Sequence, residues 1–326
     1  MRTLVAVALV GLVLALLASA AVRGLRRVAW SGGPDDVGRS TVQSVVEGLI
    51  VLSTLLGAAS ASILTSLGSA NLPPAPLLLG FLVVRSCLDD RSLAEGLEAL
   101  KFPQPGFWLL LTTLYAVLAA AFMPRLFQAA TYVFTIARTE GGPGSVLTPL
   151  SPVSGNITQT VYFVGDLVCF LLFYGFAGER KGAAAIARAV LACGILNVGF
   201  AALDYATFVT GTAELMSFVR NAPYRMLNEA EVMGVKRLVG SFPEASAFGS
   251  ATLPLFAFGL SLWLNGLYAR VAGLVALLSF AALVLSTSSS AYVALAAYLV
   301  IAFAGNGLRV LSGSATRVRF GFLTFT

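Results

Sequence analysis

The sequence contains no histidine among its 326 residues. This absence removes the usual proton shuttle near neutral pH and the commonest metal ligand in proteins. Cysteine is scarce as well, because Cys87, Cys169 and Cys193 lie far apart in or beside apolar runs and have no CxxC spacing. Isolated cysteines of this kind are typical of small buried hydrophobic residues. We therefore expect no metal site and no bound cofactor, and any chemistry falls to Arg, Lys, Asp, Glu, Tyr and Ser.

Charged residues are also few. They make up 11% of the chain, whereas a soluble domain carries about 25%. Hydrophobic residues account for 58%, and the mean hydropathy is +0.88. This composition indicates an integral membrane protein. The net charge of +6 does not point to a nucleic-acid partner, because the Lys and Arg residues lie in short loops between apolar runs, where they orient a protein in the bilayer.

Apolar runs recur along the whole chain and predict an all-α polytopic membrane bundle of about nine transmembrane helices, forming one membrane domain over residues 1–326. The first run resembles a cleaved signal peptide, but three arginines follow it at once, which favours a retained helix. Residues 89–101 carry leucines at helical spacing and predict an amphipathic surface helix. The predicted spans are residues 4–21, 41–68, 76–88, 107–122, 160–176, 184–209, 245–264, 271–285 and 292–303.

The basic loop residues predict the orientation of the bundle. They gather on one face, which the positive-inside rule makes cytoplasmic, at residues 23–39, 85–101, 180–181, 270 and 309–319. The two long connections, residues 123–155 and 211–237, then face outward, since long loops translocate largely regardless of charge. The first is expected to be a polar loop broken by Gly and Pro.

Ionisable groups collect near the outer ends of several predicted helices. Asp166 lies within the fifth span and Asp204 within the sixth, while Arg237 and Glu244 precede the seventh. A serine-rich junction at residues 286–290 joins the eighth span to the ninth. Charged groups at membrane depth are functional candidates by default. We predict Glu244, Asp166 and Asp204 as the catalytic carboxylates, with one of them acting as general base toward a sugar hydroxyl.

Arginine is the informative member of this set. Its planar fork matches phosphate oxygens with two hydrogen bonds, and it does not lose its proton. An outward-facing cavity with Arg237 suits a pyrophosphate whose lipid tail stays in the bilayer, and Lys236 and Arg225 are further candidate cations. Pro243 fits the first turn of a helix, which would place Glu244 near the positive end of the helix dipole.

Two simpler interpretations stay open for the same residues. The first is a set of structural ion pairs, for example between Asp204 and either Arg220 or Arg237. The second is an interfacial anchor, in which Lys236 and Arg237 extend from a helix end to the lipid headgroups. A transporter for an anionic solute fits the charges nearly as well as an enzyme.

Three segments, residues 237–244, 285–292 and 154–162, carry a resemblance to a known family. They resemble the O-antigen ligase and polymerase family, multi-helix bacterial inner-membrane proteins of cell-surface polysaccharide assembly. Residues 237–244, RLVGSFPE, resemble its motif Arg-x-x-Gly-x-Phe followed by Pro-Asn/Glu. Residues 285–292, LSTSSSAY, are similar to its Leu-(Ser/Thr)-x-Ser-Arg helix junction. Residues 154–162, SGNITQTVY, are similar to a segment of the same proteins, so the resemblance covers roughly residues 154–303.

The resemblance implies glycosyl transfer at the periplasmic face of a bacterial inner membrane. An undecaprenyl-diphosphate-linked glycan would be the donor, a second glycan or lipid A-core the acceptor, and membrane lipid and other polysaccharide assembly proteins further partners. Arg237 would hold the donor pyrophosphate, and Gly240, Pro243 and Ser288 would be the other motif positions.

The chain departs from the family pattern in two places. Residues 288–290 are serines at the junction where the family has its second arginine, and the chain reaches Thr326 without the later outer loop that usually carries a catalytic histidine. We expect either a fragment or a shortened, diverged member. The alternative functions are a transporter or flippase of a lipid-linked or anionic solute, and a non-catalytic component of polysaccharide export. The absence of a clear internal repeat ranks the transporter lower.

Overall fold

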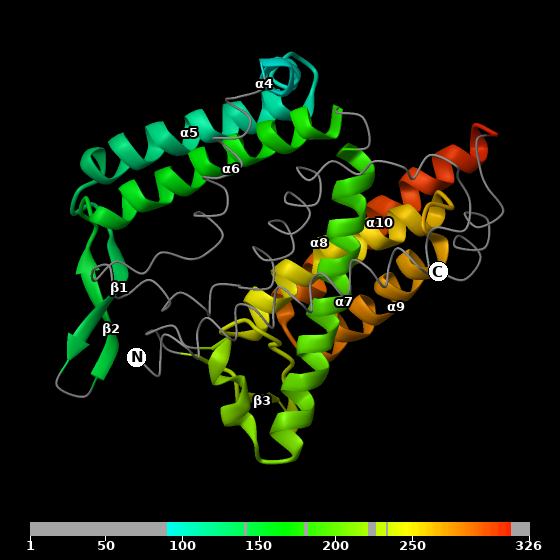
Figure 1. Ribbon diagram of the computed structural model, residues 1–326. Coiled ribbons are helices and arrows are strands. Elements are labelled where there is room, and N and C mark those ends of the chain that lie inside the picture. Colours follow the sequence, from blue (N-terminus) through cyan, green and yellow to red (C-terminus); the bar gives the residue numbers. More distant parts are fainter. Residues whose placement is uncertain (1–89, 140–141, 179–181, 221–225, 233, 314–326) are drawn as a thin grey trace, which may run out of the picture. The chain divides into compact units, whose positions relative to one another are not determined.

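The computed structural model describes residues 90–313 except residues 140–141, 179–181, 221–225 and 233 (Figure 1). The contacts divide the chain into two compact units, one of residues 79–183 and one of residues 1–78 with 184–326. The first three predicted membrane spans lie outside the described residues.

The described part is mostly helical, and five of its helices are long and apolar enough to cross a membrane. A sixth, α9, is apolar but has only 17 residues. All six coincide with predicted spans, which supports an all-helical membrane bundle; the total of about nine stays a prediction. The six are α5 (Pro105–Leu126), α6 (Ser154–Gly178), α7 (Gly182–Val209), α8 (Ala245–Leu264), α9 (Ala269–Leu285) and α10 (Ser289–Leu311).

The unit of residues 79–183 consists of a helix pair with a short element at each end. Helices α5 and α6 run side by side, with α4 (Asp90–Glu98) at one end and a β-hairpin at the other (Figure 1). Helix α4 approaches α6 closely at Gly96, where an added Cβ would lie 2.7 Å from the Leu171 carbonyl oxygen. Helix α4 confirms the predicted helix within residues 89–101, and its place on the membrane surface stays a prediction.

The β-hairpin occupies most of the first long connection. Strand β1 (Tyr132–Thr139) pairs antiparallel with β2 (Gly142–Pro149) in continuous register. The β-branched and aromatic residues of β1, in the sequence YVFTIART, favour a strand once a partner strand is present. The prediction of a polar loop over residues 123–155 is therefore wrong in this segment, because Gly142, Pro143, Gly144 and Pro149, which were interpreted as breakers, lie in the second strand.

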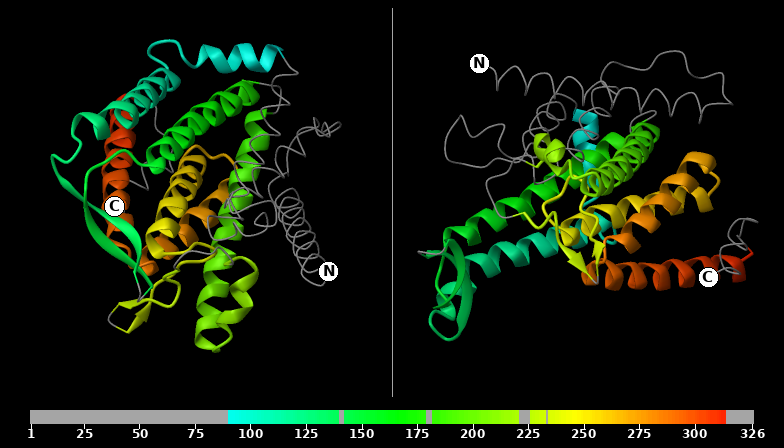
Figure 2. Two further views of the ribbon diagram at one scale, coloured as in Figure 1. Left: turned by 90° about the vertical axis from the view of Figure 1, so that its left-hand side faces the viewer. Right: turned by 90° about the horizontal axis from the view of Figure 1, so that it is seen from below.

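In the other unit, α8 and α9, the yellow and orange helices of Figure 2, are the most closely packed helices. Helix α10 packs mainly on α8. Small residues allow these approaches, as is usual between membrane helices. An added Cβ on Gly249 would lie 2.6 Å from the Ala291 methyl, and one on Gly194 of α7 would lie 2.5 Å from a methyl of Val275. The core shared by α8, α9 and α10 contains Phe256, Leu260, Leu264, Ala276, Leu283, Ala291 and Leu295.

Candidate functional site

The segment between α7 and α8 packs back against the two helices that it connects. It contains the 3₁₀ helix η2 (Ala213–Phe218), the two-residue strands β3 (Glu231–Val232) and β4 (Val235–Lys236), and residues 237–244, which we call the motif loop. Two apolar side chains of the motif loop, Leu238 and Phe242, join a buried cluster with Phe248 of α8. The rings of Phe242 and Phe248 meet edge to face at 6.2 Å. This packing holds the loop against the bundle.

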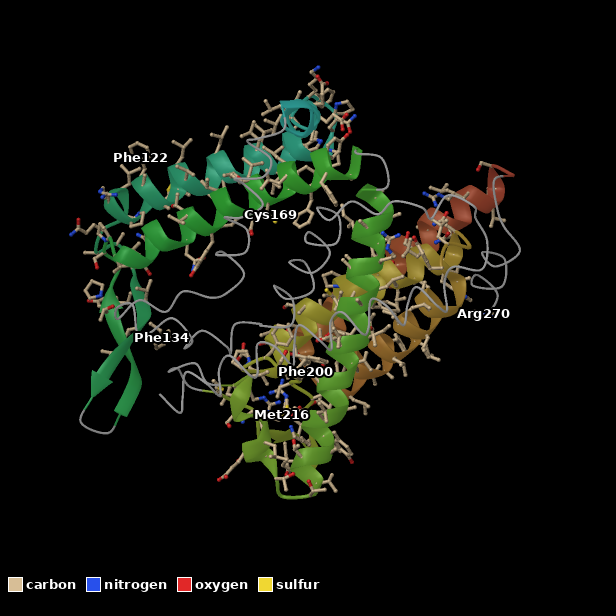
Figure 3. The ribbon with its side chains drawn as sticks, viewed as in Figure 1. Phe122, Phe134, Cys169, Phe200, Met216 and Arg270 are labelled. Atoms are coloured by element: carbon tan, nitrogen blue, oxygen red, sulfur yellow. The ribbon has the colours of Figure 1, made fainter. Side chains whose placement is uncertain are left out.

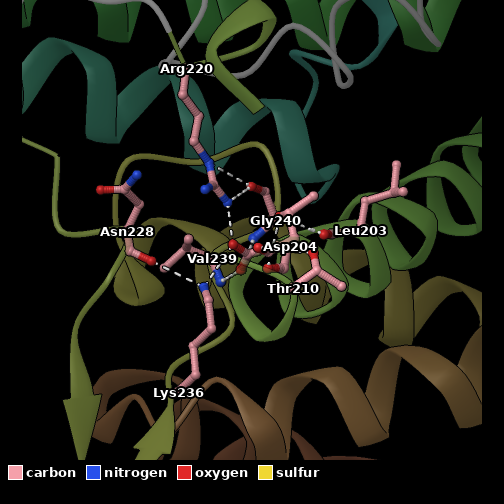
Figure 4. A network of polar contacts seen from close by, with 9 residues as sticks. Leu203, Asp204, Thr210, Arg220, Asn228, Lys236, Val239 and Gly240 are labelled. Atoms are coloured by element: carbon pink, nitrogen blue, oxygen red, sulfur yellow. Dashed lines mark hydrogen bonds and ion pairs between the residues drawn. The ribbon is translucent and has the colours of Figure 1, made fainter. Parts of the chain in front are cut away.

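A buried carboxylate, Asp204 in the last turns of α7, accepts four hydrogen bonds from this segment (Figure 4). Its Oδ1 accepts from the Arg220 guanidinium at 2.6 Å and from the Lys236 ammonium at 2.7 Å. Its Oδ2 accepts from the backbone N–H groups of Val239 at 2.9 Å and Gly240 at 3.2 Å. Asp204 therefore links α7 to two separate parts of the segment between α7 and α8, one at Arg220 and one at residues 236–240.

The two cations are buried and have further partners. Arg220 Nε donates to the Gly240 carbonyl at 3.0 Å, and Lys236 Nζ donates to the Asn228 carbonyl at 3.0 Å. The Lys236 ammonium also lies 5.2 Å from the centroid of the Phe208 ring. The side chains of Arg220 and Lys236 are only 4% and 2% exposed. We call Asp204, Arg220 and Lys236 the Asp204 cluster; with one carboxylate and two cations, its net charge is +1.

The Asp204 cluster bears on the predicted roles of its members. The predicted structural ion pair between Asp204 and Arg220 is confirmed. Because both carboxylate oxygens of Asp204 already accept hydrogen bonds from cations or amides, the geometry favours a positioning role for Asp204 over that of a general base. The Lys236 ammonium is likewise directed to Asp204. The backbone amide contacts of the cluster had no signal in the sequence, since they depend on how the segment folds back.

Gly240 is the position where the motif loop most needs glycine. Its φ is +54°, its N–H and its carbonyl both bond to the Asp204 cluster, and an added Cβ would lie 3.2 Å from the Phe248 ring. We expect Gly240→Ala to lower the free energy of unfolding by about 1–2 kcal/mol, since a left-handed backbone costs this much for a residue with a Cβ. Thermal unfolding of the purified protein in detergent measures the effect.

Gly199→Ala on α7 is the matched control for this change. Gly199 is helical, and nothing lies within 4 Å of an added Cβ. Alanine there is expected to be neutral or to stabilise the helix by about 0.5–1 kcal/mol. Equal unfolding temperatures for the two alanine variants would contradict the left-handed geometry of Gly240.

Arg237 follows Lys236 in the chain but takes no part in the Asp204 cluster. Its backbone N–H donates to the Ala230 carbonyl at 3.1 Å. The side chain is half-buried, and its Nε is buried without a hydrogen-bond partner among the described residues. Of the two cations adjacent in sequence, Lys236 is therefore held by Asp204, whereas Arg237 has a donor with no partner in the part of the chain that the structure describes.

Two of the three segments that carry the family resemblance, residues 237–244 and 285–292, lie next to each other. The Leu238 N–H donates to the Leu285 carbonyl at 3.3 Å, which joins the motif loop to the end of α9. Two residues on, Thr287 has a φ of +46°, and its buried hydroxyl also has no partner among the described residues. Ser288, the N-cap of α10, is 1% exposed and its hydroxyl lies 3.0 Å from that of Ser290. The serine junction thus borders the loop of Arg237.

Glu244 and Pro243 lie directly before the first residue of α8. Helix α8 begins at Ala245, so Glu244 is the N-cap and Pro243 precedes the helix; the prediction that Pro243 occupies the first turn is wrong. Glu244 still lies at the positive end of the helix dipole. The side chain is half-buried and accepts a hydrogen bond from the Ser246 hydroxyl. Its carboxylate has fewer bonds than that of Asp204.

The remaining candidates fall elsewhere. Asp166 is an exposed residue of α6 and belongs to the other unit, and Arg225 lies outside the described residues. In the part of the chain that the structure describes, no three Cys, Asp or Glu side chains gather in a way that could hold a metal ion.

Comparison with known proteins adds no relative: no family model, curated protein or solved structure matches the chain. The resemblance to O-antigen ligases and polymerases therefore rests on the motif residues alone, and what these residues do follows from their geometry and chemistry.

Proposed function

We propose that the chain is a bacterial inner-membrane glycosyltransferase, a polysaccharide polymerase or O-antigen ligase, that uses an undecaprenyl-diphosphate-linked glycan at the periplasmic face. The observation that carries the proposal is the contrast between three neighbouring cations. Arg220 and Lys236 are held by Asp204, whereas Arg237 has a buried Nε without a partner among the described residues. An arginine whose Nε has no partner among the described residues suits a diphosphate.

The charge of the surroundings supports an anionic ligand. The Asp204 cluster carries a net charge of +1, and it is buried, so solvent screens it less than a surface charge. Its residues directly precede the motif loop or bond to it. The positive potential of the cluster therefore adds to the charge of Arg237.

The proposed reaction uses two groups of the motif loop. Glu244 accepts the proton of an acceptor sugar hydroxyl, whose oxygen attacks the anomeric carbon of the donor glycan. The bond between that carbon and the diphosphate oxygen breaks as the new glycosidic bond forms. Undecaprenyl diphosphate leaves with the bonding electron pair, and Arg237 stabilises the negative charge that develops on it.

The test of this function is glycan transfer by the purified protein in liposomes, supplied with an undecaprenyl-diphosphate-linked glycan and an acceptor glycan. We expect Glu244→Gln to slow transfer by about 10²–10⁴-fold, the usual contribution of a general base. Glu229→Gln is the matched control, since Glu229 is an exposed carboxylate of the same connection. Equal rates for wild type and Glu244→Gln would exclude Glu244 as the base.

A non-catalytic role in polysaccharide export is the second candidate. It is favoured by the finding that two of the predicted site residues, Asp204 and Lys236, are bonded to each other and to the protein backbone. In this case the purified wild-type protein would transfer no glycan. A substitution of Asp204 that destabilises the fold would still disrupt assembly of the export complex.

A further inference from the structure

A cavity of about 380 Å³ lies at the β-hairpin end of the α5–α6 pair. Ala120 and Ala121 of α5 line it with small side chains, and Val153 lines it where the chain enters α6. Three polar residues line the same space: Arg125 from the last turn of α5, and Asn156 and Thr160 from the first turns of α6. All lie within one unit of the chain.

Arg125 is the one charged residue among those that line the cavity. One Nη donates to the Ala121 carbonyl of its own helix, and a guanidinium carries five N–H donors. The Thr160 hydroxyl donates to the backbone carbonyl of Asn156 at 2.9 Å, and Asn156, whose side chain carries an amide, also lines the space. The cavity therefore presents one positive charge and an amide donor, and its lining residues supply no acidic group.

The depth of the cavity in a bilayer follows from helix length. The 22 residues of α5 extend about 33 Å at 1.5 Å per residue, close to the hydrocarbon thickness of about 30 Å. Arg125, in the last turn, then lies at the level of the lipid phosphates. The adjoining hairpin exposes Tyr132 and Phe134, and such aromatic residues are enriched at that level (Figure 3).

The surface next to the cavity is apolar. Leu118 and Phe122, one turn apart on α5, are each 56% exposed, and Val161 on α6 is 61% exposed. Exposed side chains of this kind on a spanning helix face acyl chains. The cavity with its arginine therefore opens where a headgroup would lie above them.

We propose that this cavity binds the phosphate of an anionic membrane phospholipid. The Arg125 guanidinium pairs with the phosphate, the Asn156 amide donates to the headgroup, and the acyl chains lie along the exposed faces of α5 and α6. Charge complementarity and depth together select this ligand, since a phospholipid phosphate is the anion present at that level of the membrane. The site does not depend on the proposed glycosyl transfer.

The test is native mass spectrometry of the full-length protein released from nanodiscs that contain phosphatidylcholine and phosphatidylglycerol. Wild type is expected to retain phosphatidylglycerol in preference to phosphatidylcholine. Arg125→Gln is expected to weaken this retention about fivefold, the usual effect of one basic residue near an anionic lipid surface. Ala121→Leu, which keeps the charge and occupies part of the cavity next to Arg125, is expected to weaken it as well.

Arg270→Gln is the matched control. Arg270 is an exposed arginine near the start of the apolar helix α9 and lines no part of the cavity (Figure 3). A plain interfacial anchor predicts equal losses for Arg125→Gln and Arg270→Gln and no effect of Ala121→Leu, and that result would overturn the proposal. Displacement of the bound lipid by inorganic phosphate alone would also overturn it, because it would show a site for the free ion.

Discussion

Asp204→Asn is expected to lower the free energy of unfolding by about 3–5 kcal/mol, the usual cost of removing one partner from a buried ion pair. The amide keeps the shape of the carboxylate but not its charge. Arg220 and Lys236, which are 4% and 2% exposed, would then be buried without a counter-ion. Thermal and denaturant unfolding of the purified protein in detergent, followed by circular dichroism, measures the loss.

Two variants show whether the loss comes from the buried charges. Asp166→Asn removes an exposed carboxylate of α6 and is expected to change stability by no more than about 0.5 kcal/mol. The double variant Asp204→Asn with Lys236→Met removes one of the uncompensated cations. It is expected to lose less stability than the sum of the two single changes, since contacting residues are coupled. If Asp204→Asn had the same free energy of unfolding as the wild type, the result would contradict the stabilising role of the Asp204 cluster.

Arg237→Ala is expected to abolish surface polymer and to reduce glycan transfer in vitro by about 10²–10³-fold, the usual loss when one donor to a developing negative charge is removed. The protein is expected to insert and unfold as wild type does, because the buried Nε has no hydrogen bond among the described residues to lose. Arg237→Lys keeps the charge without the planar fork, so it is expected to retain part of the activity.

Measurement of the free energy of unfolding distinguishes Arg237→Ala from Asp204→Asn, because activity and stability are expected to fall together in Asp204→Asn. Arg270→Gln is the activity control, since Arg270 lies at the opposite end of α9 from Leu285, the residue bonded to the motif loop. Unchanged polymer length and amount in Arg237→Ala would remove the support for the proposed transferase, and the lipid site at Arg125 would be unaffected by that outcome.

Helix α8 and the β1–β2 hairpin show where sequence reasoning succeeds and where it stops. The run from Ala245 to Leu264 is apolar throughout and is bounded by Glu244 and by the turn at Asn265, so its helix was predicted at both ends. The hairpin was missed because the stability of strand β1 depends on its pairing with β2. A local pattern of Gly and Pro does not show whether two segments pair.

Some residues of the candidate site were also identified from the sequence, whereas their contacts were not. Arg237, Glu244 and Asp204 were identified as ionisable groups at membrane depth, because any such group is costly in an apolar sequence and therefore conspicuous. Their partners were not identifiable from sequence, apart from Arg220 as one option for Asp204. The contacts of Asp204 include two backbone N–H groups, and every residue of the motif loop except Pro243 has such a group.

The membrane class and the six described apolar helices follow from amino-acid order alone, because the bilayer thickness sets the length of an apolar run and each helix satisfies its own backbone. The distribution of charges at the site does not follow from amino-acid order alone. Asp204 bonds to groups between 16 and 36 residues further along the chain. Only the path of the chain between α7 and α8 brings Arg220 and Lys236 to that carboxylate and leaves Arg237 outside it.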